Sequence, residues 1–162
     1  MEDYMGVIPM TVIMAVLILL DQLSKLFAIY TIKPAGQLDF IPHILNLVYV
    51  ENTGAAFSMF DGARGFLLLF TGAVLIVASA ALYRDLLQDK FGNICLLFIV
   101  AGGWANFIDR LFRGYVVDYF NCLFIDFPVF NVADCYVTCG VIALIVYILF
   151  FNRDLLKDEK HD

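Results

Sequence analysis

Two aspartates, Asp118 and Asp134, stand in apolar stretches of the sequence, where an ionised carboxylate needs a partner. Asp118 interrupts a β-branched and aromatic run, VVDYF at 116–120. Asp134 follows Asn131 by three residues, the spacing of a capping box at a helix start, so it also has a structural explanation. Two facing acids could share one proton and activate water. The residues alone leave the catalytic and structural roles open.

Other polar residues interrupt apolar runs, where charged side chains are costly. Asp21 and Lys25 are four residues apart, so on a helix they share a face and can pair, either to anchor the helix or to support a site. Asn106, Asp109 and Arg110 lie within one helical turn of each other near the end of another run. These five residues are therefore candidates for a polar site at helix ends.

The glycine pair at 102–103 lies one turn before Asn106. It removes side-chain bulk, so a neighbouring helix or loop backbone can approach closely. A packing seam followed by a snorkelling arginine would explain this segment without any catalysis. Spacing alone does not separate that explanation from a functional one.

Four apolar runs must carry these residues, at about 8–30, 65–83, 92–112 and 133–151. Each is close to the roughly 20 residues of a bilayer-spanning helix, and backbone groups in lipid must be satisfied within their own segment. Hydrophobic residues make up 62% of the chain and charged residues 16%, with a mean hydropathy of +0.86. The first run is too long for a signal-peptide core and lacks a cleavage site, so we expect it to be retained. The sequence predicts a membrane all-α bundle of four transmembrane helices, a single domain over 1–162.

Two mixed segments, 31–64 and 113–132, connect these runs on the side opposite the termini. The apolar, β-branched stretch 44–50 is bounded by turn residues and predicts a small strand or hairpin. Both segments follow an odd-numbered crossing, so we expect them to form a small β-containing extracytoplasmic cap. Lysines and arginines number five on the termini side and four on the other. The count favours cytoplasmic termini only if Arg110 and Arg113 are functional charges.

Composition argues against several functions. The formal net charge is −6, with no basic patch to bind nucleic acid. The histidines, His43 and His161, are far apart, and the four cysteines form no CxxC pair and no zinc-type spacing. Cys95, Cys135 and Cys139 lie in apolar runs, where a thiol usually acts as a small hydrophobe. We therefore expect no metal site.

Four motifs follow one another along the chain: DQLSK (21–25), NTGAAFS (52–58), GGWANFIDR (102–110) continuing to GYVVDY (114–119), and FNVAD (130–134). In this order they resemble the lipoprotein signal peptidase family, also called signal peptidase II. The likeness spans about 21–140 and agrees with the four-helix plan. Ser24 replaces a frequent Thr, Ala105 a frequent Gly and Tyr119 a frequent Phe, and none of these departures touches the two acids.

The resemblance implies an aspartic peptidase of the bacterial inner membrane, with both termini cytoplasmic and the active site near the outer leaflet. Such enzymes remove the signal peptide from prolipoproteins, cutting before a cysteine that carries a diacylglyceryl group, and use no metal or organic cofactor. Asp118 and Asp134 would be the catalytic pair. We expect a monomer whose partners are the prolipoprotein signal peptide and membrane lipid. The family's substrate-binding and supporting positions correspond to Asp21, Lys25, Asn52, Gly54, Asn106, Asp109, Arg110, Asn131 and Ala133.

Three other interpretations fit parts of the pattern. A small proton-coupled membrane transporter could use Asp21, Asp109, Asp118 and Asp134 as a chain of intramembrane acids, but these acids lie at helix ends and in the cap, and no inverted repeat is found. A structural subunit would use the glycine pair as a seam but leaves Asp118 unexplained. A di-acid metal site lacks a histidine partner.

Overall fold

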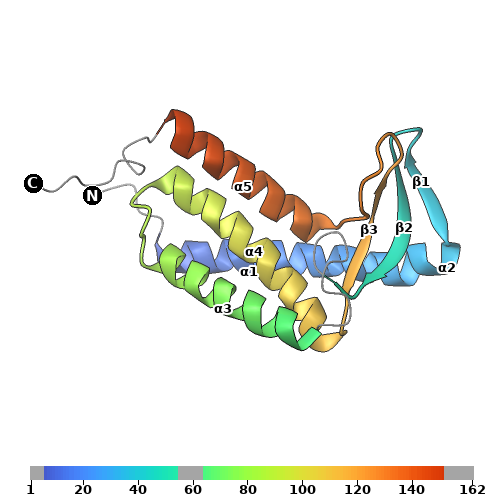
Figure 1. Cartoon of the computed structure of the whole chain (residues 1–162), viewed down its shortest axis with the longest axis horizontal. Helices are drawn as coiled ribbons and strands as arrows, with labels where there is room; N and C mark the ends of the chain where they lie inside the picture. Colours follow the sequence, from blue (N-terminus) through green and yellow to red (C-terminus); the bar gives the residue numbers. More distant parts are fainter. Residues whose placement is uncertain (1–5, 55–63, 152–162) are drawn as a thin grey trace, which may run out of the picture.

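A computed structural model describes residues 6–54 and 64–151 of the chain. Four long helices lie side by side, and a three-stranded sheet stands at one end of them (Figure 1). All four helices are long and apolar enough to span a membrane, which confirms the predicted membrane bundle. The elements are α1 (Val7–Phe27), a π-helical turn (Ala28–Ile32), α2 (Lys33–Ala35), β1 (Gln37–Ile41), β2 (Leu45–Asn52), α3 (Arg64–Tyr83), α4 (Lys90–Phe112), β3 (Val116–Cys122) and α5 (Val132–Phe150).

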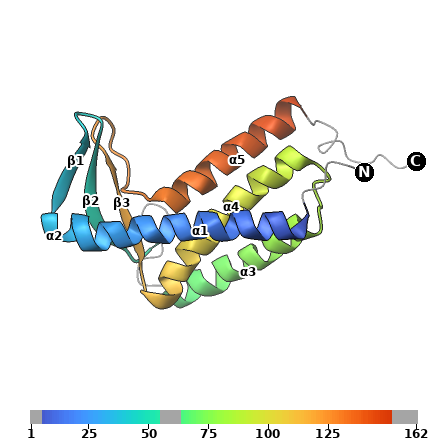
Figure 2. The same ribbon diagram turned by 180° about the vertical axis from the view of Figure 1, so that it is seen from behind.

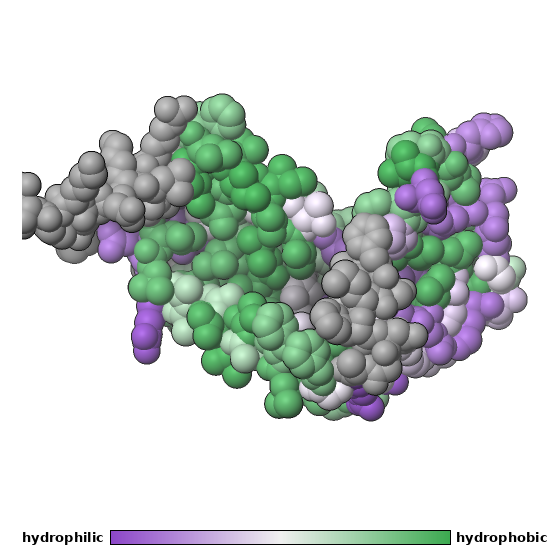
Figure 3. Space-filling model, in the orientation of Figure 1, coloured by the Kyte–Doolittle hydropathy of each residue, from purple (hydrophilic) through white to green (hydrophobic). Residues whose placement is uncertain are grey.

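Helix α4 is the centre of the bundle and packs against α1, α3 and α5. Its buried face includes Leu97, Val100 and Ala101, which meet Met10 and Met14 of α1. The outward faces of the helices carry large exposed apolar side chains. Figure 3 shows this apolar surface over the helices and a more hydrophilic surface at the sheet end. That division is expected for helices in lipid with a cap in water.

The first helix is longer than its hydropathy predicts. It was expected to end near 30, but the helical run continues through the π turn and α2 to Ala35. Ala28 and Ile32 on this extension are fully buried against Leu47 and Val117 of the sheet. The extension therefore carries the sheet, rather than serving as a loose connection.

The sheet has the order β1-β2-β3, with both pairs antiparallel. Strand β2 confirms the strand predicted at 44–50, and β3 confirms the strand-like setting of Asp118. Val50 of β2 lies opposite Asp118 of β3. Residues 55–58 of the second motif lie outside the described residues, as does the rest of the expected cap up to 63.

The start of α1 and the end of α5 both lie at the end of the bundle away from the sheet (Figures 1 and 2). Helices α3 and α5 lie on either side of α4 in both views. The first turn of α5 meets α4 at Gly102 and Asn106, and the N-cap residue Asn131 contacts β3. The predicted site residues come from these meeting points.

Candidate active site

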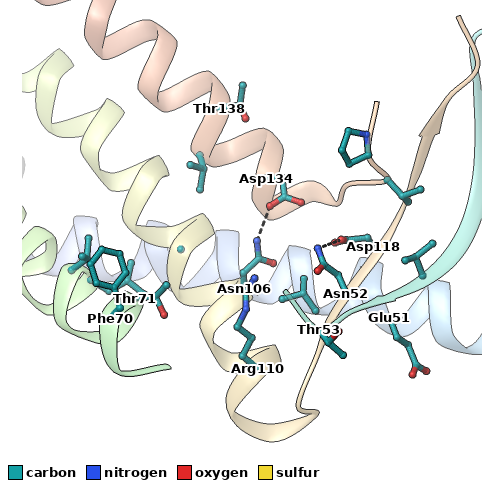
Figure 4. A pocket seen from close by; sticks show the side chains of 18 of the residues that line it. Glu51, Asn52, Thr53, Phe70, Thr71, Asn106, Arg110, Asp118, Asp134 and Thr138 are labelled. Carbon is teal, nitrogen blue, oxygen red and sulfur yellow. Dashed lines mark hydrogen bonds between the residues drawn. The ribbon is translucent and has the colours of Figure 1, made fainter. Parts of the chain in front are cut away.

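Asp118 and Asp134 come from different elements but line the same cavity (Figure 4). Asp118 lies within β3, and Asp134 lies in the first turn of α5. The cavity has a volume of about 810 Å³. Asn52, Asn106 and Arg110 share its polar end with the two acids (Figure 4).

Asn131 binds both carboxylates. As the N-cap of α5, its Oδ1 accepts a hydrogen bond from the Asp134 backbone N–H at 3.0 Å, and its own N–H donates to Asp134 Oδ2 at 3.0 Å. This is the predicted capping box. The Asn131 Nδ2 group donates to Asp118 Oδ1 at 2.6 Å. One fully buried side chain thus ties the start of α5 to β3 and fixes the two acids relative to each other.

The Asp118 carboxylate is only 2% exposed. Its Oδ2 accepts a hydrogen bond from Asn52 Nδ2 of β2 at 2.9 Å (Figure 4). Asn52 is itself oriented, because its Oδ1 accepts from the Gly54 N–H at 3.0 Å. Burial, and then the nearby charge of Asp134, raise the pKa of Asp118 to about 6, against the lowering effect of its hydrogen bonds.

Asp134 is bound from the side of α4. Asn106 Nδ2 donates to Asp134 Oδ1 at 2.8 Å (Figure 4). The Oδ1 end of Asn106 accepts from Lys25 Nζ at 2.7 Å and from Asn131 Nδ2 at 3.2 Å. The Asn106 amide therefore lies between a buried cation and one of the two acids.

A buried ion cluster lies behind Asn106. Lys25 Nζ is 2.7 Å from Asp21 Oδ2 and 2.9 Å from Asp109 Oδ2, and all three side chains are 0% exposed. This confirms the predicted pairing of Asp21 with Lys25 and adds Asp109 to it. Arg113 pairs with the other oxygen of Asp109. Two acids and two bases make the cluster formally neutral, as buried charges require.

The glycine pair brings two helices close to α4. A Cβ at Gly102 would overlap the carbonyl oxygen of Ala133 in α5, and a Cβ at Gly103 would overlap Leu75 of α3. This confirms the close approach predicted for the pair. The buried Ala133 N–H donates to Asp21 Oδ1 at 2.8 Å. The first turn of α5 is therefore held against both α4 and α1.

Arg110 also lines the cavity. The Arg110 Nη2 atom donates to the Gly54 carbonyl oxygen at 2.7 Å. Asp109 instead pairs with Lys25 and Arg113. The Arg110 Nε is buried and has no hydrogen-bond acceptor within the described residues.

All eleven predicted site residues belong to one connected set of hydrogen bonds and ion pairs. Gln22 was not predicted as a site residue, but it donates to Asp109 Oδ1 at 3.1 Å and accepts from Arg113 at 2.9 Å. The apolar cavity wall formed by Phe70 and Val74 of α3 was not predicted either. Neither has a local signal, because both roles depend on contacts between helices.

Solved structures with the same fold are bacterial membrane enzymes. One, determined by the in meso method at 2.3 Å resolution, superposes with a TM-score of 0.85 at 30% sequence identity and covers 100% of this chain and 99% of its own. Another, at 1.9 Å resolution, gives a TM-score of 0.82 at 31% identity over 93% of this chain and 99% of its own. The fold is thus the fold of these bacterial membrane enzymes.

The sequence comparisons define the family. The family model described as signal peptidase (SPase) II matches residues 13–150. A lipoprotein signal peptidase of Streptococcus agalactiae is 43% identical over 83% of this chain and 88% of the relative. One from Enterococcus faecalis is 38% identical over 92% of both chains. The chain belongs to the signal peptidase II family, and it is a multi-pass bacterial membrane protease.

Proposed function

We propose that this chain removes signal peptides from prolipoproteins by hydrolysing the peptide bond before a diacylglyceryl-modified cysteine, with Asp118 and Asp134 as the catalytic pair. Family membership supports the reaction and the prolipoprotein substrate. The observation that carries the assignment of the pair is Asn131, which hydrogen-bonds to both carboxylates in the cavity. In the described part of the chain, neither acid takes part in a salt bridge, whereas Asp21 and Asp109 are both neutralised.

The two acids have different surroundings, which supports a division of roles. Burial raises the pKa of Asp118 to about 6, so this acid retains a proton at mildly acidic pH. Both oxygens of Asp134 accept hydrogen bonds from N–H groups, and it lies at a helix N-terminus, where negative charge is favoured. Asp134 is therefore the base and Asp118 the acid.

The reaction uses one water. Asp134 removes a proton from this water as its oxygen forms a bond to the scissile carbonyl carbon, and Asp118 donates its proton to the carbonyl oxygen. When the tetrahedral intermediate collapses, the carbon–nitrogen bond breaks and the leaving amine takes up the proton held by Asp134. Asp118 then recovers its own proton from the former carbonyl oxygen, so the pair returns to its starting state.

The cavity fits a substrate that is part lipid and part peptide. Its apolar wall comes from α3 and α5, including Phe70, Val74 and Val137, whereas the polar groups gather at the sheet end (Figure 4). Because α3 and α5 lie on either side of α4 and both line the cavity, acyl chains of the modified cysteine can lie between them while the scissile bond reaches the acids. This arrangement supports lateral entry from the bilayer.

Arg110 supplies a binding group for the peptide. Its buried Nε has no acceptor within the described residues, although its Nη2 donates to the Gly54 carbonyl oxygen. A buried donor left unpaired carries an energetic penalty, which a substrate carbonyl oxygen would relieve. We therefore assign Arg110 to substrate binding next to Asp118 and Asp134.

The same proposal sets the orientation in the membrane. The acids lie at the sheet end of the bundle, opposite the start of α1 and the end of α5. With the termini in the cytoplasm, the sheet forms the extracytoplasmic cap and the acids lie near the outer leaflet. The proposed enzyme is a monomer surrounded by lipid, with no nucleic-acid partner and no cofactor.

The direct test is cleavage by the purified protein of a prolipoprotein peptide with a diacylglyceryl cysteine, compared with the same peptide without lipid. We expect one cut, before the cysteine, in the lipidated peptide alone, and no loss of rate in EDTA. Equal cleavage of both peptides would contradict the lipid requirement, and loss of activity in EDTA would contradict a metal-free acid pair.

A further inference from the structure

Asn106 links Lys25 to Asp134 by hydrogen bonds. The Lys25 Nζ atom lies within hydrogen-bond distance of Asp21, Asp109 and the Asn106 Oδ1 atom, and the Lys25 side chain is 0% exposed. Asn106 then donates from Nδ2 to Asp134 Oδ1 at 2.8 Å. The side-chain amide of Asn106 on α4 thus connects Lys25 on α1 with Asp134 on α5.

The contacts of Asn106 force one orientation of its amide. An amide can turn by 180° and exchange its donor and acceptor ends. Lys25 offers only N–H donors, and the Asn131 Nδ2 group that faces Asn106 is also a donor, so the end towards them must be the oxygen. The NH2 end therefore faces Asp134 and donates to Oδ1 of its carboxylate. A turned amide would present its oxygen to that carboxylate, so that two acceptors would face each other.

We propose that Lys25 is a positioning residue that fixes the orientation of the Asn106 amide and thereby keeps Asp134 as the base of the pair. This inference rests on the function proposed above and deepens it, since it assigns the ion cluster a part in the division of roles between the acids. The geometry also explains why a lysine, which can only donate, is buried next to an asparagine.

Other charged groups surround the two acids, so the test must separate the orientation of the amide from the electric field of Lys25. The charges that face the pair from the packed elements are those of Asp21 and Lys25 on α1, Glu51 on β2, and Asp109 and Arg110 on α4. Removing Lys25 alone would leave Asp21 buried without its partner, and the fold itself could fail.

The variant Asp21→Asn/Lys25→Met avoids that problem, because it removes one negative and one positive charge together. An amide at position 21 can still accept the hydrogen bond from the Ala133 N–H, and Asp109 keeps Arg113. Asp21→Asn alone retains Lys25 and is the matched reference. The double variant and its reference are compared twice, once with Asn106 in place and once with Asn106→Ala added. Thermal unfolding in detergent is the folding control.

The readout is the pH dependence of kcat/KM for the lipidated peptide. With Asn106 in place, we compare Asp21→Asn/Lys25→Met with Asp21→Asn. We expect the added Lys25→Met change to move the acidic limb of the pH profile up by about one pH unit and to lower the maximal rate about 10- to 100-fold. With Asn106→Ala, the same change should add less than about a twofold effect, because the amide is gone. Equal shifts in both backgrounds would show that Lys25 acts by its charge alone and would overturn the proposal, as would no shift in either.

If Asp21→Asn/Lys25→Met does not fold, Asp21→Asn/Lys25→Gln carries the same test, because the shorter glutamine keeps a polar group near Asp109 without the reach of Lys25. Cleavage by the wild type separates the two proposals. Failure of the wild type to cut the lipidated peptide refutes the proposed function itself. Cleavage without the predicted shift refutes only the role of Lys25.

Discussion

Asn131 and Asp134 hold each other by two reciprocal hydrogen bonds, each 3.0 Å long, between the side chain of one and the backbone N–H of the other. The same asparagine donates to Asp118 at 2.6 Å. A helix cap and a contact to the second acid of the proposed catalytic pair are therefore combined in one residue. The structural explanation of Asp134 and its proposed role as a base are compatible, because the cap is what positions the carboxylate.

Asn131→Ser should separate these two roles. Serine is a good N-cap and can keep the bond to the Asp134 N–H, but it has no amide to donate to Asp118. We expect thermal stability close to that of the wild type and cleavage slower by about 10- to 100-fold. Asn131→Ala should lose the cap as well, at a further cost of about 1 kcal/mol. Wild-type cleavage by Asn131→Ser would rule out a catalytic role for the Asn131–Asp118 contact.

The stability of the protein should depend on pH through Asp118. Its folded-state pKa of about 6 lies above the ordinary value of 3.8, so the folded state binds the proton more tightly than the unfolded state. This contribution is fully present below about pH 4 and is lost as the pH rises through about 6, a change of about 3 kcal/mol.

Asp118→Asn removes that titration and so provides the measurement. The melting temperature of the variant minus that of the wild type should increase by several degrees between about pH 4 and pH 7 and then level off. A difference that is constant over this range would show that the Asp118 pKa is not raised. A difference that decreases with rising pH would show that the pKa of Asp118 is lowered in the folded protein.

Gly102→Ala should damage the seam between α4 and α5. The added Cβ would overlap the Ala133 carbonyl oxygen and lie 2.8 Å from Val137 Cγ2, so the first turn of α5 must shift. We expect a loss of about 1–3 kcal/mol of stability together with reduced cleavage, because Asp134 follows Ala133. Gly65→Ala in α3 is the control, since its Cβ meets nothing within 4 Å. If both variants behave alike, the seam does not position the site.

Local patterns predicted the parts of the site that lie on one helix. The spacing of Asn131 and Asp134 predicts the capping box, and the spacing of Asp21 and Lys25 predicts their ion pair, because neighbours on a helix are fixed by its period. The sequence also predicts the four spans from the lengths of the apolar runs. The glycine pair at 102–103 predicts a close approach but not which helices make it.

Contacts between helices could not be predicted in the same way. Lys25 meets Asn106 and Asp109 across 81 and 84 positions of the chain, and no periodicity reports on such a distance. The extension of the first helix to Ala35 was missed because hydropathy falls near Lys33 and Pro34. Pro34 lies in the three-residue α2 that follows the π turn, at the very end of this helical run.

In the proposed function, Asp118 and Asp134 perform the hydrolysis. The most direct test is cleavage of the lipidated prolipoprotein peptide by Asp118→Asn and Asp134→Asn, with Asp39→Asn on the exposed strand β1 as a matched control. We predict that each of the first two is slower than the wild type by about 100- to 10,000-fold while remaining folded, and that the control is unaffected. Cleavage by either site variant within about tenfold of the wild-type rate would contradict the assignment.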